Sequence, residues 1–72
     1  MTFGERAVGV SFNPSQNKDV ALVKECYAEV IDFLNEARTK SQDAEVKRML
    51  SVAITETQTA QMWAVKAITW EG

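Results

Sequence analysis

The feature that most constrains this chain is a long stretch, from Pro14 to Gly72, with no helix-breaking residue inside it. Pro14 is the only proline, and the other two glycines, Gly4 and Gly9, both precede it. Proline and glycine are the residues that most strongly disfavour the interior of a helix. The chain after Pro14 is therefore free to form long helices, and we expect an all-α fold.

The apolar residues that follow Pro14 have the spacing of an amphipathic helix, which we predict over residues 15–40. Its main seam alternates spacings of three and four residues, as in a coiled coil, and consists of Val20, Val23, Tyr27, Val30, Leu34 and Ala37. A second stripe beside the seam contains Leu22, Cys26 and Phe33, while Glu29 and Ile31 flank these rows. Asn13 or Ser15 is expected to cap the helix. So wide an apolar face requires more than one packing partner.

A second helix is predicted over residues 43–70, after a turn near Thr39 to Asp43. Ser41 or Asp43 is expected to cap it, and Glu45 suits the positive end of its dipole. The row expected to pack is Val46, Met49, Ala53, Glu56, Ala60, Trp63, Ala67 and Trp70, in which Glu56 is the only charged member. The expected flanking residues are Leu50, Ile54, Val65 and Ile68.

Residues 55–59, with the sequence Thr-Glu-Thr-Gln-Thr, interrupt the apolar pattern of the second helix without breaking it. Threonine is a mediocre helix former, so this stretch was not selected for helix stability alone. Two interpretations stay open: a polar layer that fixes the register between helices, or a surface that binds a ligand. Glu56 falls in the packing row and favours the first, whereas Thr55 and Thr59 share one face and favour the second.

We expect residues 1–72 to form one helical-hairpin domain, with an N-terminal arm (residues 1–14) and two antiparallel helices. The arm has a faint strand-like alternation but no second strand to pair with, so we expect an extended segment with room for one helical turn near residues 5–8. A chain this small buries only about 60% of its unfolded surface. Cys26 is the only cysteine and histidine is absent, which excludes an internal disulfide and disfavours structural zinc. We therefore expect a homo-oligomeric helical bundle.

Composition also excludes several function classes. A lone cysteine without histidine lacks the usual base of nucleophilic catalysis, and pairs such as Asp43–Lys47 and Glu45–Arg48 explain the carboxylates as solvated charges. We therefore expect neither an enzyme nor a bound cofactor or metal. A formal net charge of −2 argues against a nucleic-acid polymer as partner. No apolar run approaches the roughly 20 residues of a membrane span, and no signal pattern is present, so an intracellular protein is expected.

Aromatic and cationic side chains are expected to gather at one end of the hairpin. Lys18 and Lys24 lie near the start of the first helix, Lys66 lies near the end of the second, and the arm brings Arg6 and Phe12. A helix N-terminus with nearby lysines suits a phosphate, and an exposed aromatic ring can stack a base. Ordinary surface lysines and a hydrophobic staple by the phenylalanine are the alternatives.

The other large aromatic residues have predominantly structural interpretations. Tyr27 falls on the seam of the first helix, and Trp63 falls on the packing row of the second, so both are expected in the core. Trp70 lies near the end of the second helix and is expected at an interface.

Three segments of the chain resemble the hairpin-domain family of phage anti-CBASS and anti-Thoeris sponge proteins. The matching segments are Arg6-Ala7-Val8-Gly9-Val10-Ser11-Phe12-Asn13-Pro14-Ser15, Ala53-Ile54-Thr55 and Thr59-Ala60-Gln61-Met62-Trp63-Ala64-Val65-Lys66-Ala67. The resemblance spans residues 6–69. Its specificity comes from the combination of the Phe-Asn-Pro-Ser segment with the Met-Trp-Ala-Val-Lys-Ala segment.

The resemblance implies a phage protein that sequesters cyclic oligonucleotide messengers of CBASS, or signals of Thoeris, without cleaving them. The implied partner is a cyclic di- or trinucleotide, or a cyclic ADP-ribose isomer, in the host bacterial cytoplasm. The implied assembly is a homo-oligomer, with a hexamer favoured, whose dinucleotide pockets lie between protomers and include the arm. The alternative that the residues leave open is a structural helical oligomer or a protein-interaction adaptor without a small-molecule ligand.

The resemblance also implies a set of ligand-binding residues: Phe12, Asn13, Ser15, Lys24, Thr55, Thr59 and Lys66. Phe12 corresponds to an arm aromatic that stacks on a base, although it lacks the hydroxyl of the tyrosine in some relatives. Lys66 corresponds to a cation of the second helix that is an arginine in some relatives, and a lysine meets phosphate as a point charge. Lys24 lies near a phosphate-contacting lysine of the family. Thr55 and Thr59 correspond to polar positions that meet base edges or a central ligand.

Overall fold

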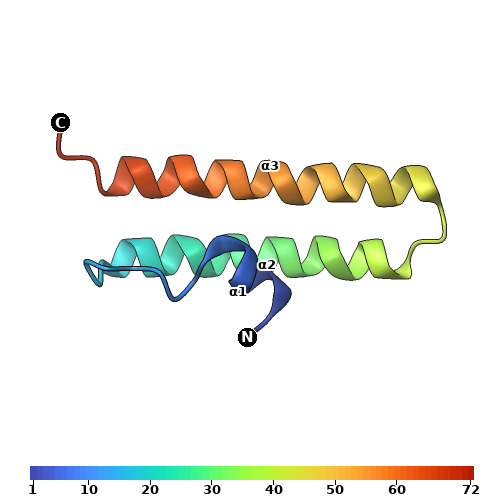
Figure 1. Cartoon of the computed structure of the whole chain (residues 1–72), viewed down its shortest axis with the longest axis horizontal. Helices are drawn as coiled ribbons and strands as arrows, with labels where there is room; N and C mark the ends of the chain where they lie inside the picture. Colours follow the sequence, from blue (N-terminus) through green and yellow to red (C-terminus); the bar gives the residue numbers. More distant parts are fainter.

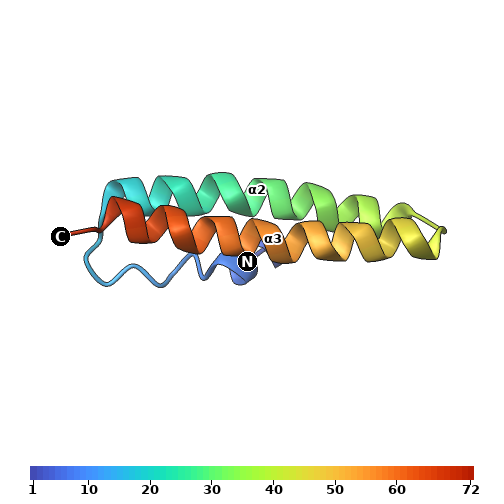
Figure 2. The same cartoon turned by 90° about the horizontal axis from the view of Figure 1, so that it is seen from above.

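Two long antiparallel helices dominate the fold, which the computed structural model describes for all residues 1–72 (Figure 1). α1 spans Phe3–Val8, α2 spans Lys18–Lys40 and α3 spans Ala44–Ile68, with no strand. α2 and α3 lie side by side in both views, and the N-terminal arm runs along the hairpin toward the end where α3 finishes (Figures 1 and 2). The all-α prediction is confirmed. None of the helices has the length and apolar character needed to cross a lipid bilayer.

The start of α2 differs from the prediction. The helix begins at Lys18 rather than at residue 15, and its cap is Asn17, whose side-chain oxygen accepts hydrogen bonds from the amides of Asp19 (2.8 Å) and Val20 (3.1 Å). The expectation that Asn13 or Ser15 caps this helix is therefore wrong. One asparagine oxygen satisfies two of the amides that a helix leaves unpaired at its start.

The prediction for α3 agrees more closely with the structure. Asp43 is the cap, as one of the two expected candidates, and its carboxylate accepts from the amides of Glu45 (2.8 Å) and Val46 (3.2 Å). The helix continues through residues 55–59 without a break, as expected, and it ends at Ile68 rather than at residue 70.

The arm is more ordered than the extended segment that we expected. A capping box links Thr2 and Glu5 at the start of α1, because the threonine hydroxyl accepts from the Glu5 amide and the Glu5 carboxylate accepts from the Thr2 amide. Gly9 ends the helix with a φ of 63°, a left-handed conformation that suits glycine. These two signals frame a helix too short to be stable without tertiary contacts.

The core forms where the arm meets the hairpin. Val8 of α1, Ala28 and Ile31 of α2, and Ile54 of α3 are buried together, with Tyr27 among the partly buried residues packed on them. The predicted core role of Tyr27 is confirmed. The seam predicted for α2 is confirmed in part: Val20 is buried and Leu34 packs on the core, but Val30 is exposed. Lys24, Ala28 and Ile31 are also buried, although they lie outside the predicted seam. The docked arm covers this side of α2 and so determines which row is buried.

The packing row predicted for α3 is wrong. Trp63 is 66% exposed instead of lying in the core, and the expected flanking residue Ile54 is buried against α2 and the arm. We call the exposed row the outer face of α3; it consists of Met49, Val52, Trp63 and Trp70. α2 has a corresponding outer face, which consists of Leu22, Cys26 and Phe33. Both long helices therefore present apolar side chains away from the hairpin core.

The ion pairs lie near the turn that joins α2 to α3. The predicted Glu45–Arg48 pair is present at 2.5 Å, and the hydrogen bond from the guanidinium lowers the pKa of Glu45. The predicted Asp43–Lys47 pair is absent, because Asp43 serves as the cap and the Lys47 ammonium donates to the Arg38 carbonyl at 3.0 Å. The Glu45–Arg48 pair is solvent-exposed, so its contribution to stability is small.

Gly4 allows α1 to approach α2 closely. Its amide donates to the Asp32 carboxylate at 2.6 Å, and a Cβ atom at this position would lie 2.1 Å from the Ala28 carbonyl oxygen. No side chain fits at that distance unless the backbone of one helix moves. The first contact of the arm with the hairpin therefore requires glycine.

We predict that Gly4→Ala destabilises the fold by about 1–3 kcal/mol, because overpacking a close contact forces a backbone shift. Thermal unfolding followed by circular dichroism at a fixed protein concentration measures the change. Gly72→Ala is the control for the added methyl group, since nothing lies within 4 Å of a Cβ there and the φ of 88° at this terminal residue is free to change. Equal melting temperatures for the two variants would contradict the close contact of α1 with α2.

Candidate functional site

The arm and the neighbouring ends of the two long helices line a small, half-open pocket, which we call the arm pocket. Its volume is about 220 Å³, and it is lined by Phe12, Asn13, Pro14, Ser15, Val20, Lys24, Val65 and Thr69. The pocket thus brings together four residues of the set predicted from the sequence: Phe12, Asn13, Ser15 and Lys24. Val65 and Thr69 line it from α3 and from the cap that follows, which the sequence reasoning missed. Only the hairpin topology places these two positions beside the arm.

Lys24 lines this pocket and is buried, with 4% of its surface exposed. Its ammonium donates to the carbonyl oxygen of Gly9 at 2.9 Å and to that of Phe12 at 2.5 Å. It also lies 5.6 Å from the centroid of the Phe12 ring, within the range of a cation–π interaction. The charge of Lys24 is therefore compensated by the arm itself.

The Phe12 ring is 72% exposed although it lies over a buried cation. An exposed phenylalanine offers a flat apolar surface for which this chain supplies no further packing partner. Such a surface can stack a planar base, an interaction worth roughly 1–3 kcal/mol. The geometry therefore suits the stacking role expected for this residue better than the alternative of a hydrophobic staple.

Asn13 and Ser15 play different parts in the loop between Gly9 and α2. The Asn13 side chain donates to the Asn17 carbonyl at 2.9 Å and accepts from the Asn17 amide at 3.2 Å, which closes the turn before α2. Gln16 within this turn has a φ of 53°, an uncommon conformation for a residue with a side chain. The Ser15 side chain makes no hydrogen bond within the protein and lines the arm pocket. It is free to meet a polar ligand group.

Lys66 and Thr59 lie outside the arm pocket, on a separate shallow surface of α3. Thr59, Met62, Trp63 and Lys66 line a depression of about 170 Å³. The Lys66 ammonium lies 5.4 Å from the centroid of the Trp63 ring and 5.7 Å from that of Trp70. The expected meeting of Lys66 with Phe12 at one site is therefore not found within a single chain.

The polar residues 55–59 divide into distinct roles. Gln58 donates to the Ala7 carbonyl at 3.0 Å and so ties α1 to α3, a role that no sequence signal indicated. The hydroxyls of Thr55 and Thr59 donate to the carbonyls of Ser51 and Thr55 within the helix, both at 3.2 Å, which leaves their oxygens free to accept. Glu56 is exposed. Within one chain these residues form no buried polar layer.

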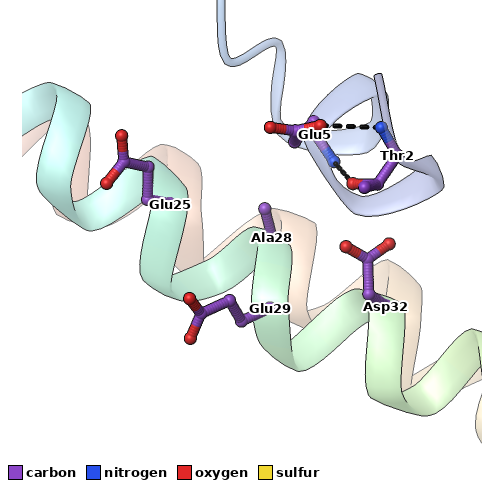
Figure 3. Close-up of a pocket in the computed structure, with 6 residues that line it drawn as sticks. All are labelled: Thr2, Glu5, Glu25, Ala28, Glu29 and Asp32. Atoms are coloured by element: carbon purple, nitrogen blue, oxygen red, sulfur yellow. Dashed lines mark hydrogen bonds between the residues drawn. The ribbon is translucent and has the colours of Figure 1, made fainter.

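A second hollow between α1 and α2 is strongly acidic (Figure 3). It has a volume of about 290 Å³, and its lining consists of Thr2, Glu5, Glu25, Ala28, Glu29 and Asp32. Glu5 and Asp32 already accept hydrogen bonds from backbone amides of the arm. No cluster of side chains in the structure is arranged to hold a metal ion. The carboxylates here repel a phosphate, which leaves the arm pocket and the Lys66 surface as the anion-compatible sites.

Comparison with known proteins places the chain beside one described family. A family model described as the Acb2/Tad1 hairpin domain matches residues 5–69, which include the arm pocket, all of α2 and α3, and most of α1. Neither the curated proteins nor the solved structures contain a match to the chain. The match confirms the family resemblance drawn from the arm segment and from the α3 segment around Trp63.

We predict that Asn13→Ala lowers the melting temperature of the ligand-free protein, because it removes both hydrogen bonds to the Asn17 backbone. Each such bond contributes about 1 kcal/mol, and 1 kcal/mol corresponds to about 4–8 °C in a domain of this size. Thermal unfolding measures the effect. Ser15→Ala is the matched control, because its side chain makes no hydrogen bond within the protein. Equal melting temperatures for the two variants would contradict the role assigned to Asn13.

Proposed function

The chain belongs to the Acb2/Tad1 hairpin-domain family, and we propose that it binds and sequesters cyclic oligonucleotide second messengers of bacterial immunity without cleaving them. The observation that carries this proposal is the arm pocket, in which an exposed aromatic ring and a lysine lie together inside the matched region. The proposed place of action is the cytoplasm of the host bacterium, where a phage anti-defence protein meets such messengers.

The chemistry of the arm pocket suits a nucleotide. Phe12 offers a stacking surface for a base, and Ser15 offers an unpaired hydroxyl. Lys24 adds a positive charge to the lining, although its ammonium is buried and donates to two arm carbonyls. The first turn of α2 lies at the pocket through Val20, and the positive end of a helix dipole favours an anion.

The pocket of one chain is too small to enclose a cyclic dinucleotide. Its volume of about 220 Å³ lies below the roughly 300–1,000 Å³ of pockets that bury a small ligand. Effective sequestration needs nanomolar affinity, about −12 kcal/mol, which one stacked base and one or two charge contacts do not supply. We therefore propose that a second protomer completes the site.

The exposed surface supports association. The chain exposes 5176 Å², whereas a compact monomer of 8.0 kDa exposes roughly 4,500 Å². The excess includes the apolar outer faces of α2 and α3, which a hairpin leaves uncovered. We propose a homo-oligomer in which these faces lie between protomers, and family membership favours a hexamer.

The Lys66 surface is a candidate for a second ligand contact in such an assembly. Lys66 and Thr59 line one depression, and Thr55 lies one helical turn before Thr59 on the same face. When several protomers bring these positions together, lysines provide charge for phosphates and threonine oxygens accept hydrogen bonds. A polar central ligand is the kind of occupant that this arrangement suits.

The alternative function is a structural oligomer or a protein-interaction adaptor without a small-molecule ligand. The outer faces of α2 and α3 favour it, because exposed apolar rows serve protein contacts as well as assembly. A structural or adaptor function does not account for the exposed Phe12 ring held beside a buried lysine. We therefore prefer the binding and sequestration of a cyclic oligonucleotide.

We predict that the protein binds at least one member of a panel of cyclic dinucleotides, cyclic trinucleotides and cyclic ADP-ribose isomers with nanomolar affinity in calorimetry. Mass spectrometry should recover the ligand intact after incubation. Phe12→Ala should weaken binding of a ligand held in the arm pocket by about 1–3 kcal/mol, the value of one stacked base. Silence across the whole panel would favour the adaptor function, and turnover would indicate an enzyme.

We further predict that Trp63→Glu dissociates the assembly, because it places a charge in an apolar contact between protomers. Native mass spectrometry, with and without a mixed nucleotide pool, measures the number of protomers. Gln42→Glu is the control, since it adds the same charge at an exposed turn position away from the outer faces. If the Trp63→Glu variant assembles with the same number of protomers as the unaltered protein, the outer face of α3 is not part of the interface.

A further inference from the structure

Side-chain hydrogen bonds attach the arm to the hairpin at three points along its length. Asp32 of α2 accepts from the Gly4 amide, Gln58 of α3 donates to the Ala7 carbonyl, and Lys24 of α2 donates to the carbonyls of Gly9 and Phe12. The first two points hold α1. We call residues 9–12 the arm turn. Lys24, at the third point, is the only side chain of α2 or α3 that makes a hydrogen bond to the arm turn.

The geometry at the third point closes a turn around one cation. The Phe12 amide donates to the Gly9 carbonyl at 2.9 Å, and the same carbonyl accepts from the Lys24 ammonium at 2.9 Å. The Phe12 carbonyl is the second acceptor, and the Phe12 ring lies over the ammonium. One buried charge thus contacts both ends of the arm turn and the ring that it carries.

From this geometry we propose that Lys24 is a positioning residue, which prepares the Phe12 ring for stacking by holding the arm turn closed. Hydrogen bonds to a charged donor are stronger than those between neutral groups. A ring fixed before binding loses less conformational freedom when the ligand arrives, which increases affinity. The stacking of a ligand base on Phe12 rests on the proposed function. The closure of the arm turn by Lys24 does not, because it is a property of the free protein.

A positioning role differs in its consequences from a direct phosphate contact. If Lys24 acts through the ring, its removal has little further effect once Phe12 has been truncated. If it acts only on a phosphate, its removal weakens binding by the same factor whether or not the ring is present. The coupling between the two substitutions therefore separates the two roles.

The first test uses the ligand-free protein. Lys24→Met removes the charge, and we expect hydrogen exchange of the Phe12 amide to become at least about tenfold faster while the central amides of α2 and α3 stay protected. Lys40→Met is the matched control, since this lysine is exposed at the far end of the same helix. If Lys24→Met does not fold, Lys24→Gln, which loses the charge but keeps a donor, is judged by the same criterion. Unchanged exchange at Phe12 would overturn the proposal.

The second test is a double-mutant cycle with cyclic di-AMP as the probe, measured by calorimetry on the full chain. We expect Phe12→Ala and Lys24→Met each to weaken binding about tenfold or more, and the double variant to bind about as weakly as either one. If the double variant instead weakens binding by the product of the two single factors, the two residues act independently and the positioning role is overturned. If the unaltered protein binds no member of the nucleotide panel, the proposed function fails, while the exchange experiment still decides whether Lys24 holds the arm turn.

Discussion

The contact between α1 and α2 is the constraint on which the rest of this structure depends. Gly4 lets the two backbones meet at Ala28, and the short helix then adds Val8 to the core that contains Ile31 and Ile54. Only eight residues of the chain are buried, so each of these contacts carries a large share of the stability. The docked arm also determines which side of α2 faces inward and where the arm turn begins.

Two consequences follow from that docking. The side of α2 that carries Lys24 faces the arm, so a lysine becomes the anchor of a loop instead of a surface charge. The arm and α2 together cover the side of α3 that carries Ile54, so the tryptophan row faces away from the core. The contact at Gly4 thus determines which sides of α2 and α3 are buried in the core and which stay exposed to other molecules.

Much of the fold follows from local signals in the sequence. The absence of proline and glycine after Pro14 predicted two long helices, and Asp43 was one of the two expected caps of α3. On α3 the choice between two apolar rows did not follow, because both rows have helical periodicity and only the packing of the arm and α2 decides which one is buried. The sequence shows neither that Asn17 outcompetes Asn13 as a cap nor that Gln58 reaches the arm, since both depend on loop geometry. For the site, the resemblance indicated residues that the fold gathers into one pocket, but it did not separate Lys66 from them.

The arm pocket also has a consequence for the order of folding. Its lining comes from residues near both ends of the chain, with Phe12 on one side and Thr69 on the other. The hairpin closes through a short turn, whereas the pocket needs a contact across most of the sequence, and non-local contacts form late because they close large loops. Helical content is therefore expected to appear before binding competence during refolding, so a partly folded chain with much of its helix formed would still lack a nucleotide site.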